Sequence, residues 1–244
     1  KEPISVHVDT PVDEVIQTIE KYNLVAVPVV DSIGRLVGRI TVDDVMDEVR
    51  EQAERDYQLA SGLSQDVETD DSVLRQTSAR LPWLLIGRLG GIGNSMILGN
   101  FDTTFAAHPE MALYIPLIGC TGGNVGTQSS ALVVQGLANS SLDANNTWKQ
   151  ILKESVVALI NATIISMLVY IYNFVRFGPT ATVSYSVSLS LFAVVMFASI
   201  FGTLVPMTLE KLKIDPAIAT GPFISITNDI IGMMLYMGIT VLLS

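Results

Sequence analysis

The chain has 244 residues, of which 49% are hydrophobic and 16% are charged, and its formal net charge is −10. Soluble chains carry roughly 25% charged residues, so this composition indicates a large apolar part. Residues 1–76 hold 17 acidic and 7 basic side chains, whereas residues 77–244 hold 7 of each. The acidic first third does not suit nucleic acid, which requires clustered Lys and Arg, and divalent cations are the more natural partner.

Residues 1–50 predict a small mixed α/β unit. Strands are expected at 4–8, 25–30 and 36–40, with one helix over 10–23 and another after Thr41. Asp31 and Gly34 are turn residues between the last two strands. With the run G-x-I-T-x-x-D at Gly38 to Asp44, this order resembles one cystathionine-β-synthase (CBS) repeat, which we expect to be the second of a pair.

An acidic connecting helix and linker are expected over residues 51–80. The acidic helix begins near residue 43, and its carboxylates recur at three- and four-residue spacing and so share one face. They are Asp44, Asp47, Glu51 and Glu54. A solvated surface helix explains this spacing as well as a cation site does. A second acidic cluster, at Asp66, Glu68, Asp70 and Asp71, favours cation binding.

Residues 81–244 predict an α-helical polytopic membrane domain with five transmembrane helices. A span needs about 20 apolar residues. Spans are expected near 81–101, 111–138, 151–175, 183–208 and 217–243. Basic residues gather at the ends that share a side with the acidic segment, which predicts a cytoplasmic N-terminus in the cell (inner) membrane. Arg88 interrupts the first span, and a structural or a functional role fits it equally well.

The second predicted span contains a polar, glycine-dense run, Gly119 to Ser130. Glycines four residues apart are typical of close helix packing, which is the structural alternative. Packing does not explain Asn124 and Gln128, whose amides lie four residues apart on one face. With backbone carbonyls open at the glycines, this face predicts the lining of a cation pathway.

The last predicted span holds Asp229 near its middle, next to Asn228. An intramembrane carboxylate is a functional hypothesis by default, and a buried ion pair with Arg88 is the structural alternative. One carboxylate does not strip water from Mg²⁺ but holds the hydrated ion. Two copies about a twofold axis would bring two carboxylates together, so a homodimeric pore is expected.

These segments together resemble the MgtE family of magnesium channels over essentially the whole chain. The marks are the run G-G-N-x-G-x-Q at Gly122 to Gln128 and P-F-x-x-x-x-N-D-x-x-G at Pro222 to Gly232. The resemblance implies a dimer whose pore is built from the second and fifth helices, with Asp229 binding hydrated Mg²⁺. Groups near Gly123, Thr127 and Gly221 would line that pore.

The resemblance also implies that cytoplasmic Mg²⁺ gates the pore through acidic residues of the connecting helix. The matching candidates are Asp44, Asp47, Glu51, Glu54 and Asp56. CBS pairs often bind adenine nucleotides such as ATP, and Thr41 with Asp44 fits that motif. An N-cap threonine with a first-turn acid explains these two residues equally well.

Two alternatives remain open. A transporter of other hard divalents, such as Co²⁺ or Mn²⁺, would use the same oxygen ligands. An intramembrane metalloprotease would need zinc ligands, and His7 and His108 have no Glu or His at ligand spacing, so no enzyme is expected. No second intramembrane acid is expected beside Asp229, so proton coupling is not indicated and a passive channel is favoured by the resemblance.

Overall fold

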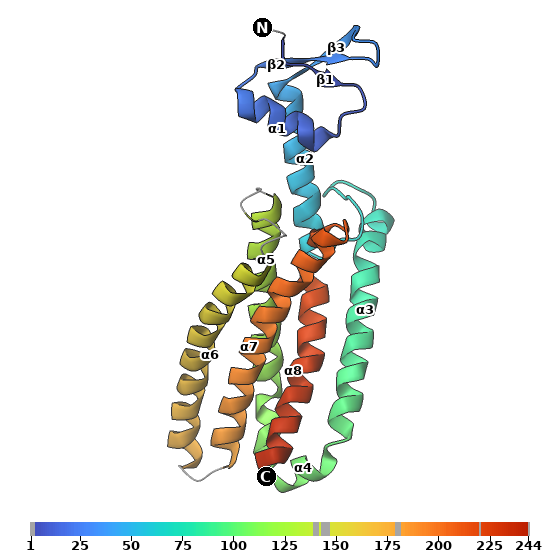
Figure 1. Cartoon of the computed structure of the whole chain (residues 1–244). Helices are drawn as coiled ribbons and strands as arrows, with labels where there is room; N and C mark the ends of the chain where they lie inside the picture. The colour runs from blue at the N-terminus through green and yellow to red at the C-terminus, as the bar shows by residue number, and fades with distance from the viewer. Residues whose placement is uncertain (1–2, 139–141, 143–146, 179–181, 220, 244) are drawn as a thin grey trace. The chain divides into compact units, whose positions relative to one another are not determined.

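The computed structural model describes residues 3–138, 142, 147–178, 182–219 and 221–243 (Figure 1). The chain forms two compact units, a first unit of residues 1–57 and a helical unit of residues 58–244. The division lies inside one helix, because α2 runs without a break from Val42 to Ala60. The connecting helix expected from residue 51 is thus the continuation of the last helix of the first unit.

In its described residues, from 3 onward, the first unit is a three-stranded sheet with two helices. Strand β2 is central, and it pairs in parallel with β1 and in antiparallel fashion with β3. The elements are β1 (Val6–His7), α1 (Val12–Tyr22), β2 (Ala26–Val30), β3 (Leu36–Thr41) and α2 (Val42–Ala60). The three strands, α1 and the start of α2 lie within three residues of the bounds expected from the sequence, in the predicted β-α-β-β-α order.

Local chemistry and apolar burial explain this order. The Asp31 carboxylate accepts hydrogen bonds from the backbone N–H groups of Ile33 and Arg35, at 3.0 and 2.8 Å. Gly34 supplies the positive φ (+80°) that reverses the chain into β3. A small core gathers apolar side chains from β1, α1, β2 and α2, namely Val6, Val15, Ile19, Val27 and Val45.

Among the described residues, the helical unit contains five long helices that run side by side (Figure 1). Helix α7 contacts α5, α6 and α8, and α8 in turn contacts α5 and α3. The long helices are α3 (Val73–Gly99), α5 (Ile115–Ala138), α6 (Thr147–Phe177), α7 (Thr182–Lys211) and α8 (Gly221–Leu243). The short ones are α4 (Asp102–Ala107), η1 (Pro109–Tyr114) and η3 (Pro216–Ala219).

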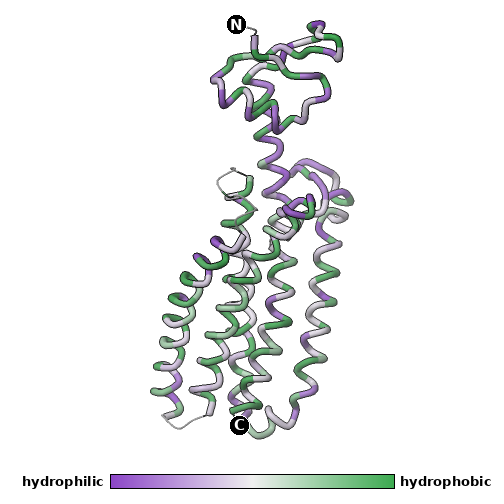
Figure 2. Tube along the Cα trace, in the orientation of Figure 1, coloured by the Kyte–Doolittle hydropathy of each residue, from purple (hydrophilic) through white to green (hydrophobic). Residues whose placement is uncertain are grey.

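The long helices are largely hydrophobic, whereas α2 is hydrophilic (Figure 2). Within the described residues, α6, α7 and α8 are long and apolar enough to cross a membrane. Helices α3 and α5 fall short of the same measure because α3 carries Arg88 among glycines and α5 is rich in glycine, hydroxyl and amide groups. The described residues therefore contain three helices of membrane-spanning character, and the count of five spans stays a prediction.

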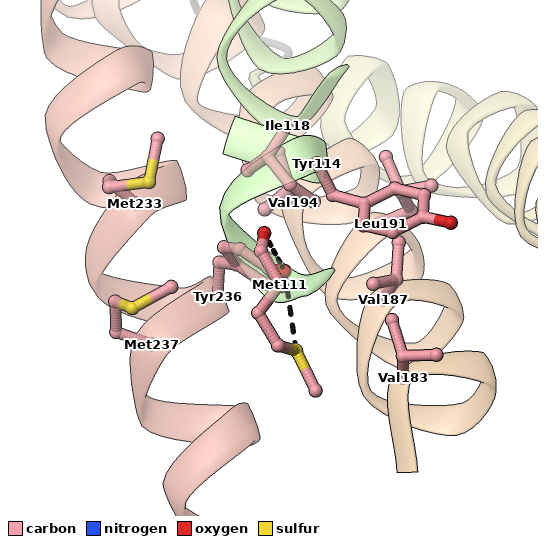
Figure 3. Close-up of a cluster of buried hydrophobic side chains, with 10 residues drawn as sticks. All are labelled: Met111, Tyr114, Ile118, Val183, Val187, Leu191, Val194, Met233, Tyr236 and Met237. Atoms are coloured by element: carbon pink, nitrogen blue, oxygen red, sulfur yellow. Dashed lines mark hydrogen bonds between the residues drawn. The ribbon is translucent and has the colours of Figure 1, made fainter. Parts of the chain in front are cut away.

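One apolar cluster ties η1 to the helices around it (Figure 3). Met111 of η1 is fully buried, and the hydroxyl of Tyr236 on α8 donates a hydrogen bond to its carbonyl oxygen at 2.8 Å. Tyr114 donates from the same turn to the side-chain oxygen of Asn173 on α6. The cluster includes Val183, Val187 and Leu191 of α7 and Met233 and Met237 of α8.

Helices α5 and α7 lie so close that their backbones are in contact. A Cβ atom on Gly202 of α7 would collide with the carbonyl group of Gly126 on α5. Backbone does not move aside as a flexible side chain does, so this contact requires glycine at position 202.

Replacing this glycine tests the contact. We expect Gly202→Ala to destabilise the protein by about 1–3 kcal/mol, as overpacking of a tight interior does. Gly238→Ala is the matched control, because a Cβ at Gly238 meets nothing within 4 Å. Thermal unfolding in detergent micelles measures both. Equal unfolding temperatures for the two variants would contradict the backbone contact.

Candidate cation site

Asp229 lies in the middle of α8, half-buried, with its carboxylate against the glycine face of α5. Its Oδ1 atom is 3.6 Å from the position that a Cβ on Gly119 would occupy and 3.5 Å from the corresponding position on Gly123. Ser225, one turn earlier on α8, places its hydroxyl 2.7 Å from that same Gly123 position. The missing side chains thus leave the α5 backbone beside a carboxylate and a hydroxyl.

No basic side chain neutralises this carboxylate within the described parts of the chain. Neither Asp229 nor Arg88 takes part in any ion pair there. Arg88 is exposed on α3. Helix α3 meets α8 through Gly87 and Gly90, both of which face Ile226. The alternative of a buried Arg88–Asp229 ion pair is therefore absent from the described contacts.

The predicted polar face of α5 points away from its neighbours. Asn124 and Gln128 are exposed, and Thr127 is half-buried. The Asn124 amide donates to the sulfur of Cys120, one turn earlier, at 3.3 Å. Exposed amides are costly in hydrocarbon, so this face requires water or protein against it.

Asn228 does not share the surroundings of Asp229. Only 1% of it is exposed, and its amide nitrogen occupies the space that a Cβ on Gly126 would fill. Neither polar atom of this amide has a hydrogen-bond partner among the described residues. Asn228 thus faces Gly126, where α5 packs against α7, while Asp229 faces Gly119 and Gly123.

Gly221 lies at the first turn of α8, eight residues before Asp229 and hence about 12 Å along the helix. Its φ is +49°, and a Cβ there would collide with the carbonyl oxygen of Ala60. The structure therefore explains glycine at this position by the local backbone. It does not bring Gly221 to the Asp229 carboxylate.

A buried carboxyl group that was not singled out from the sequence lies in α6. Glu154 is 9% exposed, and one of its oxygens accepts hydrogen bonds from Ser129 of α5 and Ser199 of α7. Glu154 is thus a buried acid of the long helices in addition to Asp229, which was the one acid singled out from the sequence. A signal was available, because Ala158 and Ala162 continue the same face at four-residue spacing and such small residues are typical of a packed helix face.

Thr41 and Asp44 bind each other at the start of α2. The backbone N–H and the hydroxyl of Thr41 both donate to Asp44 Oδ2, at 2.8 and 2.6 Å. These bonds, the hydroxyl first, hold the pKa of the Asp44 carboxyl below its ordinary value of 3.8. The contacts are those of a helix N-terminus, and nucleotide binding by this pair stays a prediction.

Two of the predicted regulatory acids are paired with arginines of their own helix. Glu54 accepts from Arg50 at 3.1 Å, and Glu51 accepts from Arg55 at 3.5 Å. These pairs are exposed, and such pairs contribute about 0.3–0.5 kcal/mol each. Asp47 and Asp56 also lie on α2. Among the described residues, no three His, Cys, Asp or Glu side chains are grouped closely enough to hold a metal ion.

The second acidic cluster surrounds a basic side chain. Asp66, Glu68, Asp70 and Asp71 line a small cavity together with Arg75. The Arg75 guanidinium donates to Asp71 at 2.9 Å and to the Asp66 carbonyl oxygen at 3.3 Å. Part of the negative charge just before α3 is therefore balanced within the cluster.

Comparison with known proteins gives matches in both units. The sequence model of a family described as MgtE, divalent cation transporter, matches residues 115–239, and that of the CBS domain matches residues 1–51. Proteins named magnesium transporter MgtE are 33% identical over 93% of the chain in Bacillus subtilis and 32% identical over 98% in Thermus thermophilus. The chain spans about half the length of these curated relatives, 50% and 53% respectively.

The Thr41 contacts give a pH-dependent expectation. Because the pKa of Asp44 is lowered in the folded chain, its contribution to stability is present above its unfolded value of 3.8 and is lost as the pH falls through the folded value. Thr41→Val removes the hydroxyl, so the carboxyl should titrate closer to 3.8. Carboxyl carbon NMR of the labelled chain in micelles measures both midpoints, and identical midpoints would rule out the Thr41 hydroxyl as the main cause.

Proposed function

Since the chain belongs to the MgtE family of divalent cation transporters, we propose that it moves hydrated Mg²⁺ across a membrane through a homodimeric pore lined by α5 and α8. The observation that carries this proposal is the Asp229 carboxylate, which lies without a basic partner in the described parts of the chain beside the glycines of α5. The relatives named above are magnesium transporters and not enzymes, which supports transport over catalysis.

The site suits a hydrated ion better than a dehydrated one. Mg²⁺ prefers six oxygens in octahedral geometry and gives up its water reluctantly. One carboxylate supplies too few ligands to replace that shell, but Asp229 and the Ser225 hydroxyl accept hydrogen bonds from water held by the ion. Because Gly119 and Gly123 carry no side chains, the Asp229 carboxylate and the Ser225 hydroxyl lie together against the α5 backbone.

A second copy of the chain would complete the site. Two Asp229 carboxylates about a twofold axis carry together the charge that balances one Mg²⁺ ion. The exposed amides of Asn124 and Gln128 would then line the water-filled path or the contact between copies. Thr127, half-buried on the same helix, is the neighbouring hydroxyl in this arrangement.

The distribution of basic residues supports a cytoplasmic N-terminus in the cell membrane. If the first unit is inside, positive residues concentrate on the inner ends of the helices and Arg176 lies at the outer end of α6, as the positive-inside rule requires. The inner set is Arg75, Arg80, Lys149, Lys153, Lys211 and Lys213.

Cytoplasmic Mg²⁺ would gate this pore through the acidic face of α2. Asp44, Asp47, Glu51, Glu54 and Asp56 all lie on this helix. The pairs with Arg50 and Arg55 are exposed and weak, so a divalent ion competes with them for the carboxylates. Helix α2 carries these acids and continues without a break across the boundary between the two units.

Other hard divalents are the second candidate cargo. The polar groups beside Asp229 are oxygens, and oxygen ligands alone discriminate weakly between Mg²⁺, Co²⁺ and Mn²⁺. The description of the matching family as a divalent cation transporter supports keeping this class open.

Substitution of Asp229 tests the pore. In liposomes loaded with a Mg²⁺-sensitive dye, Asp229→Asn and Asp229→Ala should lower Mg²⁺ influx at least about tenfold, because the charge that attracts the ion is gone. Asp13→Asn, an exposed acid of α1, is the matched control and should leave influx unchanged. Influx of Co²⁺, Mn²⁺ and Ca²⁺ into the same liposomes defines selectivity. Undiminished Mg²⁺ influx in both Asp229 variants would refute the pore assignment.

Neutralising the acidic face of α2 tests gating. The variant with Asp44, Asp47, Glu51 and Glu54 changed to their amides should keep conducting at internal Mg²⁺ concentrations that inhibit the unmodified chain. A control with the same charge change replaces Asp9, Asp13, Glu14 and Glu20, which are exposed acids of the first unit outside α2. If internal Mg²⁺ inhibits the α2 variant as strongly as it inhibits the control, these acids do not sense Mg²⁺ and form a solvated helix surface instead.

A further inference from the structure

Glu154 is held by hydroxyl groups from two other helices. Its Oε1 atom accepts from Ser129 of α5 at 2.7 Å and from Ser199 of α7 at 2.6 Å. The two hydroxyl oxygens are also 3.0 Å apart. All three side chains are at least nine-tenths buried, so this triad joins α5, α6 and α7 in the interior of the helical unit.

A buried carboxyl group in such a position needs its hydrogen bonds. Burial removes the water that would otherwise solvate it, and no ion pair within the described residues includes Glu154. The two serine hydroxyls replace that water. Loss of either partner would leave polar atoms unpaired, so helices α5, α6 and α7 are held in the one arrangement that brings all three groups together.

The triad lies close to the point where α5 meets α7 at backbone distance. Gly126 is three residues before Ser129, and Gly202 is three residues after Ser199. A Cβ on Gly202 would collide with the Gly126 carbonyl, so the helices touch directly beside the hydrogen bonds. Contact and hydrogen bonds together fix the axial position and the rotation of α5 on α7.

The fixed point is near the Asp229 site along the same rigid helix. Ser129 follows Gly123 by six residues, which is about 9 Å along α5. A helix transmits a shift or rotation over this distance because its backbone hydrogen bonds are continuous. Any movement of α5 at Ser129 therefore changes the separation between Gly123 and the Asp229 carboxylate.

We propose that Glu154 is a positioning residue: by binding Ser129 and Ser199 it fixes α5 and so sets the geometry between the α5 glycine face and Asp229. The proposal rests on the proposed pore site for its functional consequence. Loss of the triad changes the affinity for Mg²⁺ and the selectivity over Ca²⁺, whereas a residue that only stabilises the fold changes the amount of intact protein.

The test uses three variants in liposomes containing equal amounts of folded protein. Glu154→Leu removes the acceptor, and Ser129→Ala with Ser199→Ala removes both donors. We expect both to change the Mg²⁺ concentration for half-maximal flux, or the Mg²⁺ to Ca²⁺ flux ratio, by about three- to tenfold. Glu154→Gln retains an oxygen that accepts both hydroxyl bonds and should behave like the unmodified chain.

The control for lost hydroxyls is Ser155→Ala with Ser188→Ala. These hydroxyls donate to Ile151 and Ser184 within their own helices, so they join no two helices. Unfolding temperatures are recorded for every variant. If Glu154→Leu lowers the unfolding temperature but leaves half-maximal concentration and flux ratio unchanged, the positioning role is overturned and a purely structural role remains.

A reporter on α5 separates this proposal from the pore assignment. Cys120 is the sole cysteine of the chain and is exposed on α5, next to Gly119, so a trifluoromethyl label on its thiol reports the position of that helix by fluorine NMR. The resonance should move in Glu154→Leu and stay in Glu154→Gln. An unmoved resonance in Glu154→Leu overturns the proposal. Normal Mg²⁺ flux in Asp229→Ala refutes the assignment of Asp229 to the pore. The fluorine resonance then still tests, independently of flux, whether Glu154 positions α5.

Discussion

Helix α5 lies so close to α7 and α8 that the Asn228 amide fills the space beside Gly126 and a Cβ on Gly202 would collide with the Gly126 carbonyl. This approach is possible only because glycines carry no side chains at the contact. The same glycines let the polar side chains of α8 reach the α5 backbone. Asp229 reaches the α5 backbone at Gly119 and Gly123 for the same reason. In an apolar surrounding, dispersion contacts and hydrogen bonds between helices replace the hydrophobic driving force, so glycine at these positions determines both the packing and the site.

The sequence was sufficient for the parts of the fold that follow from local chemistry. The short apolar runs and the turn at Asp31 and Gly34 predicted the strands of the first unit to within three residues, because apolar runs and turn residues act over a few positions. The glycine run and the carboxylate were each singled out from rare residues in an apolar setting. Their proximity was expected only from the resemblance to the MgtE family, which implied a pore built from these two helices.

What the sequence analysis missed depends on how helices are rotated against each other. Asn228 was grouped with its neighbour Asp229, yet adjacent residues in a helix point about 100° apart, and the structure directs Asn228 to Gly126. Glu154 was passed over because it lies near the start of its helix, where a charged residue is ordinary. Its burial depends on Ser129 and Ser199, which are 25 and 45 residues away in the chain. Spacing within one segment carries no information about such partners.

Glu154 on α6 and Asp229 on α8 differ in a way that bears on function. Glu154 is 9% exposed, and two serine hydroxyls within 2.7 Å donate hydrogen bonds to its carboxyl group, so the protein itself replaces its solvating water. Asp229 is half-buried, with no basic partner in the described parts of the chain and with bare backbone beside it. A carboxylate left in this condition costs free energy that a bound cation recovers. Glu154 is therefore the acid whose hydrogen bonds hold the helices together, and Asp229 is the acid available to bind a cation.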